Sequence, residues 1–159
     1  MTQKLLHTAV ILGFCAMAAP LAHAASSGPV DVSANEMEIT AGGKKATFRG
    51  DVDAVRTDGR IKADTMVVDY ADVKQPNGTM RSEVSKLDIT GHVSITTPTQ
   101  VITGDWAKMD VTANTLLVGG NVKVVQGKNI LKGPKLSVDL NTKRTVMSGG
   151  RVTGSFAPN

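Results

Sequence analysis

Polar and apolar residues alternate along most of this chain with a period of two. Leu136 and Val138, for example, are separated by Ser137 and flanked by Lys135 and Asp139. Successive side chains of a β-strand point to opposite faces, so this alternation predicts strands with one face in a core and the other in water. No segment after residue 24 has the 3.6-residue spacing of an amphipathic helix. We therefore predict an all-β chain.

A short repeat spaces these strands along the sequence. Its first phrase, a glycine followed two residues later by valine, occurs at Gly50-Asp51-Val52, Gly91-His92-Val93, Gly120-Asn121-Val122 and Gly150-Arg151-Val152. Its second phrase occurs at Ala63-Asp64, Gly104-Asp105 and Gly133-Pro134, and its Asp or Pro lies 14 residues after the preceding glycine each time. Regular self-similarity of this kind is typical of a repeat architecture. The longer interval before Gly91 is interpreted as a polar loop over residues 71–85, with a turn at Gln75-Pro76-Asn77-Gly78.

The apolar positions of the repeat are predicted to face one shared interior. They lie at two-residue steps after each glycine and after each Asp, Asn or Pro of the second phrase. The candidate interior residues are Met37, Ile39, Val52, Met66, Val68, Val93, Ile95, Met109, Val111, Val122, Val124, Leu136 and Val138. Residue type alone favours an ordinary closed core over an open groove.

A second set of apolar residues requires the chain to bend. Ile61, Ile102 and Leu131 each lie three residues before the Asp or Pro of the second phrase, an odd number of steps from the apolar sites that follow. One continuous strand cannot point both sets inward, so a bend, a bulge or a change of sheet is expected at the second phrase. Repeated corners predict a jelly roll or a β-solenoid-like stack rather than a flat meander.

The beginning of the chain has the pattern of an export signal. Lys4 precedes an apolar run over residues 5–19, and Ala22-His23-Ala24 offers small residues at the two positions that a signal peptidase reads. We predict that residues 1–24 are cleaved and that residues 25–159 form a single exported domain. The only cysteine, Cys15, lies in the removed segment, so the domain is expected to depend on a core and not on disulfides.

Composition narrows the classes of partner and chemistry. The net charge of +4 would suit anionic lipid or phosphate, but it favours an ordinary solvated surface. Nucleic acid is disfavoured by export and by an aromatic content of 3%. His92 beside a turn glycine is interpreted as a solvated residue, and Asp51 and Asp53 as part of a polar face. We predict no catalytic residue, no metal site and no cofactor.

Three phrases give the chain a family resemblance. They are Pro29-Val-Asp-Val-Ser-Ala-Asn35, Phe48-Arg-Gly-Asp-Val52 and Ile61-Lys-Ala-Asp64, and they occur in order on the repeat. Together with the export signal they resemble the LptA/OstA family of periplasmic lipopolysaccharide-transport proteins. The resemblance implies an open, twisted β-jellyroll of short antiparallel strands in the periplasm. It also implies binding of lipopolysaccharide, through lipid A, on the way from the inner to the outer membrane.

The resemblance also assigns roles to residues and edges. The interior residues would line a groove for lipid, with Val30 and Val32 on an N-terminal strand that meets an LptC-like inner-membrane partner. Met109 and Val111 would lie on a lipid-lining strand in mid-chain. The C-terminal end, residues 147–156, would face an LptD-like outer-membrane partner or the next copy in a head-to-tail stack. The alternative is a structural β-repeat adaptor that joins cell-envelope proteins without binding lipid.

Overall fold

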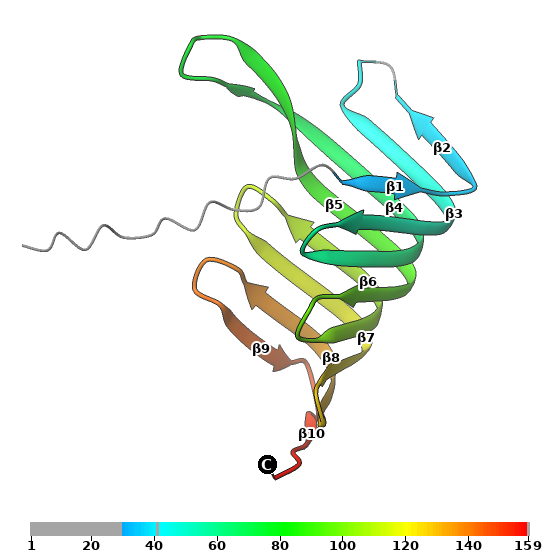
Figure 1. Cartoon of the computed structure of the whole chain (residues 1–159), viewed down its shortest axis with the longest axis vertical. Helices are drawn as coiled ribbons and strands as arrows, with labels where there is room; N and C mark the ends of the chain where they lie inside the picture. The colour runs from blue at the N-terminus through cyan, green and yellow to red at the C-terminus, as the bar shows by residue number, and fades with distance from the viewer. Residues whose placement is uncertain (1–29, 41, 159) are drawn as a thin grey trace, which may run out of the picture.

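Ten antiparallel strands form one sheet in the computed structural model, which describes residues 30–40 and 42–158 (Figure 1). The strands are β1 (Asp31–Ser33), β2 (Glu36–Ile39), β3 (Lys45–Arg56), β4 (Gly59–Lys74), β5 (Met80–Thr96), β6 (Val101–Asp110), β7 (Thr115–Gln126), β8 (Asn129–Asp139), β9 (Arg144–Ser148) and β10 (Thr153–Ser155). The prediction of an all-β fold is confirmed. The expected signal segment, residues 1–24, lies outside the described residues.

The sheet is open from its first strand to its last. Strands β3 to β8 pair in chain order, β1 and β2 both pair with β3 at one end, and β9 and β10 both pair with β8 at the other. No described strand joins these two ends, so the predicted open architecture is confirmed. The connectivity between neighbours is a meander, but the sheet is not flat.

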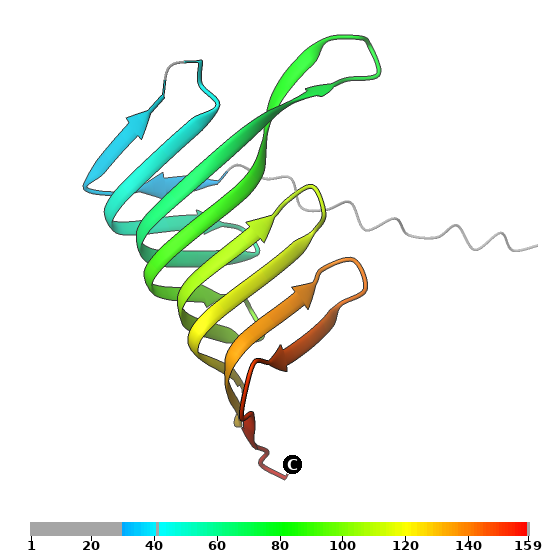
Figure 2. The same cartoon turned by 180° about the vertical axis from the view of Figure 1, so that it is seen from behind.

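Each long strand bends sharply where the repeat phrases lie. The pairing register shifts between Arg49 and Val52, between Lys62 and Thr65, and at the matching places in β5, β6 and β7. These bulges fold the sheet into two layers, which we call arm A and arm B (Figure 2). Arm A carries β2 and β9, and arm B carries β1 and β10. The bend predicted at the second phrase is confirmed, and the glycine phrase lies in the same bend.

The corner conformation explains the glycines of the repeat. Gly120 and Asn121 both have positive φ, at 73° and 48°, a backbone region that glycine and asparagine tolerate better than other residues. A Cβ at Gly120 would lie 2.3 Å from Oδ2 of Asp105, on the neighbouring strand. Gly91 has the same relation to Asp64, at 2.2 Å. The two phrases of the repeat are therefore partners across each corner.

The inner faces of both arms contribute to a single hydrophobic cluster. Ala107, Val118 and Leu136 are completely buried, and no polar or charged residue in the described chain is buried with them. The buried set is Ala46, Phe48, Val52, Ala54, Ala63, Met66, Val68, Ile89, Val93, Ile95, Ile102, Ala107, Val118, Val122, Val124, Leu136 and Val138. The burial of this apolar area is the main favourable term for the fold, because the described chain has no disulfide to add to it.

Residues 71–85 are a β-hairpin extension and not the expected loop. β4 and β5 stay paired out to Lys74 and Met80, whereas their outer neighbours stop pairing at Asp69 and Lys86. The hairpin therefore projects beyond the rest of arm A (Figure 1). The turn at its tip was predicted correctly, with the amide of Gly78 donating to the carbonyl of Gln75 over 2.9 Å. The loop prediction was wrong because these polar residues pair with one another across the two strands.

Candidate functional site

The inner faces of the two arms carry apolar rows that run across the strands from one end of the sheet to the other. In arm A the row nearest the corner is Met37, Phe48, Met66, Ile89, Ala107, Val118, Leu136 and Met147. The next row of arm A is Ile39, Ala46, Val68, Leu87, Met109, Leu116 and Val138. Arm B has Val32, Ala54, Ile61, Ile95, Ile102, Val124 and Leu131. The rows form continuous apolar tracks along the long axis of the molecule.

Nine of the residues singled out from the sequence are buried on these inner faces. They are Val52, Met66, Val68, Val93, Ile95, Val122, Val124, Leu136 and Val138. Val32, Met109 and Val111 are half-buried. The sequence pattern therefore predicts the inner-face residues correctly for the central strands, which have a neighbouring strand on both sides.

The remaining three residues are exposed. Met37 and Ile39 are each 62% exposed, because β2 has a neighbouring strand on one side only in the part of the chain that the structure describes. Val30 precedes β1 and is 53% exposed. Apolar side chains are exposed at the other end of the molecule as well, where Val152 and Phe156 are 43% and 69% exposed. Exposed apolar side chains therefore lie at both ends of the sheet.

Several inner-face residues were missed by the sequence reasoning. Phe48, Ile89 and Val118 are buried in the same row as Met66, and each lies two residues before a corner glycine. Period-two counting backwards from the glycines would have found them, whereas only the positions after the glycines and after the Asp, Asn or Pro of the second phrase were counted.

The outer face of the N-terminal part is covered by compensated charges. Arg49 donates to Glu38 over 3.1 Å and to Glu36 over 3.3 Å. Arg60 donates to Asp53 from Nε over 2.7 Å, and this hydrogen bond lowers the pKa of the Asp53 carboxyl. These pairs are exposed, so they orient side chains more than they stabilise the fold.

The corner of the sheet carries the polar side chains of the repeat. Nδ1 of His92 lies 2.8 Å from Oδ2 of Asp64, and the Asn121 amide donates to Asp105 over 3.1 Å. The hydrogen bond with Asp64 raises the pKa of His92, with a smaller contribution from the charge of Asp105. The described residues hold no group of three or more His, Cys, Asp or Glu side chains placed for a metal ion. They also contain no helix with the length and apolarity to span a membrane.

A match to a protein-family model identifies the family of this chain. Residues 31–144 match the model of the LptA/(LptD N-terminal domain) LPS transport proteins. The chain belongs to this family. The match extends from β1 to the start of β9 and so includes both arms. The family is one of lipopolysaccharide transport, and this chain is a transport component of that family.

Two individual proteins are similar to this chain, one in sequence and one in structure. An uncharacterized protein of Rhizobium meliloti (strain 1021) is 27% identical over 136 residues, which cover 82% of this chain and 72% of that protein. The crystal structure of LptH, the LptA-homologous periplasmic component of the lipopolysaccharide transport device of Pseudomonas aeruginosa, superposes with a TM-score of 0.69. That match covers 84% of this chain and 98% of LptH at 17% identity, so it confirms the fold.

Proposed function

We propose that the chain is a periplasmic bridge component that binds lipopolysaccharide through lipid A and carries it from the inner to the outer membrane. The observation that carries the proposal is the set of unbroken apolar rows on the inner faces of a sheet that is open at both ends. The residues proposed to contact lipid are those of the inner face, with Val32, Met37, Ile39 and Met109 as its accessible members.

The free-energy cost of leaving a lipid acyl chain in water is large, so a carrier needs an apolar surface to cover it. An acyl chain costs about 0.8 kcal/mol for each CH₂ exposed to water, so a chain of about twelve carbons costs roughly 10 kcal/mol. A carrier must cover that chain along the whole path and must still let it move. Rows of Val, Leu, Ile and Met side chains cover acyl chains without directional bonds that would hold the lipid at one place.

The cell-biological part of the proposal combines the beginning of the sequence with the relative. Residues 1–24 would direct export and be cleaved, and residues 25–159 would fold as one domain in the periplasm. LptH, which shares the fold, is described as a periplasmic component.

The two ends of the sheet are the proposed docking edges. Among the described residues, β1 and β2 have a strand partner on one side only at the N-terminal end, and so do β9 and β10 at the C-terminal end. Free backbone N–H and C=O groups on such edges favour strand addition. We assign the N-terminal edge to an LptC-like partner, and the C-terminal edge to an LptD-like partner or to a further copy of the chain in a head-to-tail stack.

A second candidate function is favoured by one observation. The chain's own side chains fill the space between the arms, since Val52, Val93 and Val122 are each 1% exposed. An adaptor that joins envelope proteins through its edges would need only this closed core and would hold no lipid.

Photocrosslinking at matched positions separates the two candidates. A photoreactive residue replaces Met109 on the inner face or its neighbour Lys108 on the outer face, and Ile39 or its neighbour Glu38 in β2. Lipopolysaccharide adducts at Met109 and Ile39, with few at Lys108 and Glu38, are expected for a carrier. Equal yields at both members of each pair, or no adducts while the edges still bind partners, would favour the adaptor.

A further inference from the structure

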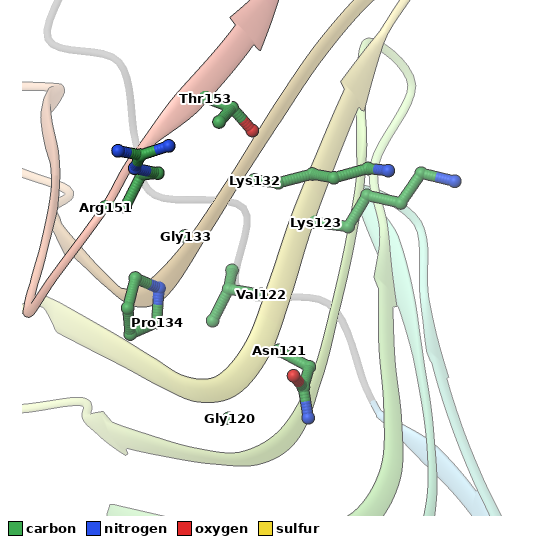
Figure 3. Close-up of a pocket in the computed structure, with 9 residues that line it drawn as sticks. All are labelled: Gly120, Asn121, Val122, Lys123, Lys132, Gly133, Pro134, Arg151 and Thr153. Atoms are coloured by element: carbon green, nitrogen blue, oxygen red, sulfur yellow. The ribbon is translucent and has the colours of Figure 1, made fainter.

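A pocket of about 600 Å³ lies at the corner of arm B near the C-terminal end of the sheet. Three cationic side chains line it, Lys123 from β7, Lys132 from β8 and Arg151 from the segment before β10, together with the hydroxyl of Thr153 (Figure 3). Lys123 and Lys132 are exposed, whereas the side chains of Val122 and Val124 beside Lys123 are buried. The two lysines therefore lie on the outer face, away from the apolar rows.

The two lysines are directly opposed in the sheet. Lys123 and Lys132 are register partners of β7 and β8, and Lys132 is also the partner of Thr153. Like charges placed opposite each other across two strands destabilise a sheet. The fold therefore places two positive charges together, and their repulsion costs free energy. A bound anion would offset this repulsion.

The internal repeat supplies a comparison at equivalent positions. In the first unit the pair at this place is Asp53 and Lys62, which carry opposite charges, and in the second it is Ser94 and Thr103, which are neutral. Only the third unit has two cations, Lys123 and Lys132. The positive pair is thus a property of this end of the molecule and not of the fold.

These cations are not neutralised within the part of the chain that the structure describes. None of Lys123, Lys132 and Arg151 forms an ion pair with a carboxylate, in contrast to Arg49, Arg60 and Lys108. At the pocket's edge, the Asn121 amide donates a hydrogen bond to the carboxylate of Asp105. Gly133 and Pro134 complete the lining without a further charge.

We propose that this pocket binds the phosphate group of a phosphorylated ligand. The lysine side chains extend away from Arg151 (Figure 3), so two ammonium groups lie on one side of the pocket and the guanidinium on the other. These groups and the Thr153 hydroxyl can donate hydrogen bonds, those of the cations charge-assisted, to phosphate oxygens, and the volume leaves room for part of an attached sugar. A phosphorylated lipid headgroup and a soluble sugar phosphate share this chemistry. The pocket goes beyond the proposed function, because it lies outside the apolar interior and its binding is measurable without acyl chains.

The first experiment titrates the purified protein with glucose 1-phosphate, with glucose as the uncharged control, and follows backbone amide shifts by NMR. The test variant is Lys123→Gln/Lys132→Gln. The matched control is Lys62→Gln/Lys108→Gln, which removes the same charge from outer-face lysines that lie near carboxylates. We expect the test variant to bind glucose 1-phosphate about tenfold more weakly, the loss expected from one to two charge-assisted contacts. Arg151→Gln is expected to weaken binding in the same direction.

The proposal would be overturned if the test variant bound glucose 1-phosphate as tightly as wild type, or if the control variant lost as much affinity. It would also be overturned if glucose 1-phosphate did not bind and the protein retained phosphorylated and dephosphorylated lipid A equally. A second arm compares those two lipids in detergent micelles. Greater retention of the phosphorylated form by wild type than by the test variant identifies the lipid headgroup as a source, whereas a response to glucose 1-phosphate alone identifies a soluble ligand. Neither arm depends on inner-face crosslinks, so failure here is distinguishable from failure of the carrier proposal.

A stability measurement tests the opposed pair itself. At low salt and without phosphate, the test variant should melt at the same temperature as wild type or higher, because a repulsive pair has been removed. A lower melting temperature would mean that the lysines serve the fold, and this would also overturn the proposal.

Discussion

The imidazole of His92 and the carboxylate of Asp64 meet across a corner of the sheet, with 2.8 Å between Nδ1 and Oδ2. Their positions in the repeat are those of Asn121 and Asp105, which meet in the same way one unit further on. At these two corners the residue after the glycine thus contacts the Asp of the neighbouring strand. The repeat in the sequence is therefore a repeated contact between adjacent strands.

This contact predicts a pH dependence that one residue controls. Asp64 raises the pKa of His92 above its ordinary 6.5, so the contact contributes stability below about pH 6.5 and loses it as the pH rises through the raised value. Asp64→Asn should bring the pKa of His92 back toward 6.5. An NMR titration of the His92 ring protons measures this directly, and an unchanged midpoint in the variant would contradict the contact.

The buried row of arm A predicts an asymmetry between two leucines. Leu136 is completely buried, whereas Leu117 on the adjacent strand pairs with Lys108 and Ser137 on the outer face. Leu136→Ala should lower the free energy of unfolding by about 2–5 kcal/mol, because it removes buried methyl groups and leaves a cavity. Leu117→Ala should cost less than about 1.5 kcal/mol. Urea denaturation of both variants provides the comparison, and equal losses would argue against the assigned faces.

The close approach at the corner predicts a difference between two glycines. Gly120 and Gly127 both have positive φ, but a Cβ at Gly127 meets nothing within 4 Å. Gly127→Ala should cost roughly 1–2 kcal/mol for the backbone conformation alone. Gly120→Ala should cost about 2 kcal/mol more, because the new Cβ also displaces Asp105. Denaturation midpoints measure the two costs, and equal values would mean that the corner yields easily.

The β4–β5 hairpin is predicted to be dispensable for folding. Beyond Tyr70 and Ser85 the register pairs of its two strands are with each other, and most of their side chains are exposed. Asp72 also forms an exposed ion pair with Lys44, which contributes little to stability. Replacing residues 72–82 with Asn-Gly should close the hairpin early and shift the melting temperature by less than about 4 °C, which corresponds to about 1 kcal/mol in a domain of this size. Calorimetry of the shortened chain tests this expectation, and a much larger decrease would show that the hairpin supports the core.

The sequence predicted the faces of the strands better than their surroundings. Ile61, Ile102 and Leu131 lie an odd number of residues from the apolar positions that follow them. This spacing correctly required a corner, because residues an odd number of positions apart in one strand point to opposite faces. Spacing does not indicate which strands lie at an edge. Met37 and Ile39 were therefore placed inside with Met66, although no strand of residues 30–40 and 42–158 lies beyond β2 to cover them.

The projecting hairpin and the pocket depend on pairings that a single sequence does not display. The stretch around Pro76 and Gly78 has the composition of a loop, and only its registered partner strand makes it regular. Lys123 and Lys132 are nine residues apart in the sequence, and their opposition follows only from the β7–β8 register. Neither feature carries a local signal strong enough to predict it.

The open topology determines how the molecule could widen. Within the described chain every strand pairing runs between lateral neighbours, and no pairing links the first strands to the last. Rotating arm A away from arm B about the corner would therefore separate apolar surfaces and leave the backbone hydrogen bonds between neighbouring strands intact. Acyl chains entering the gap would replace the separated contacts with similar ones, so opening and filling would nearly balance in free energy. A closed barrel would have to break a seam of hydrogen bonds for the same movement.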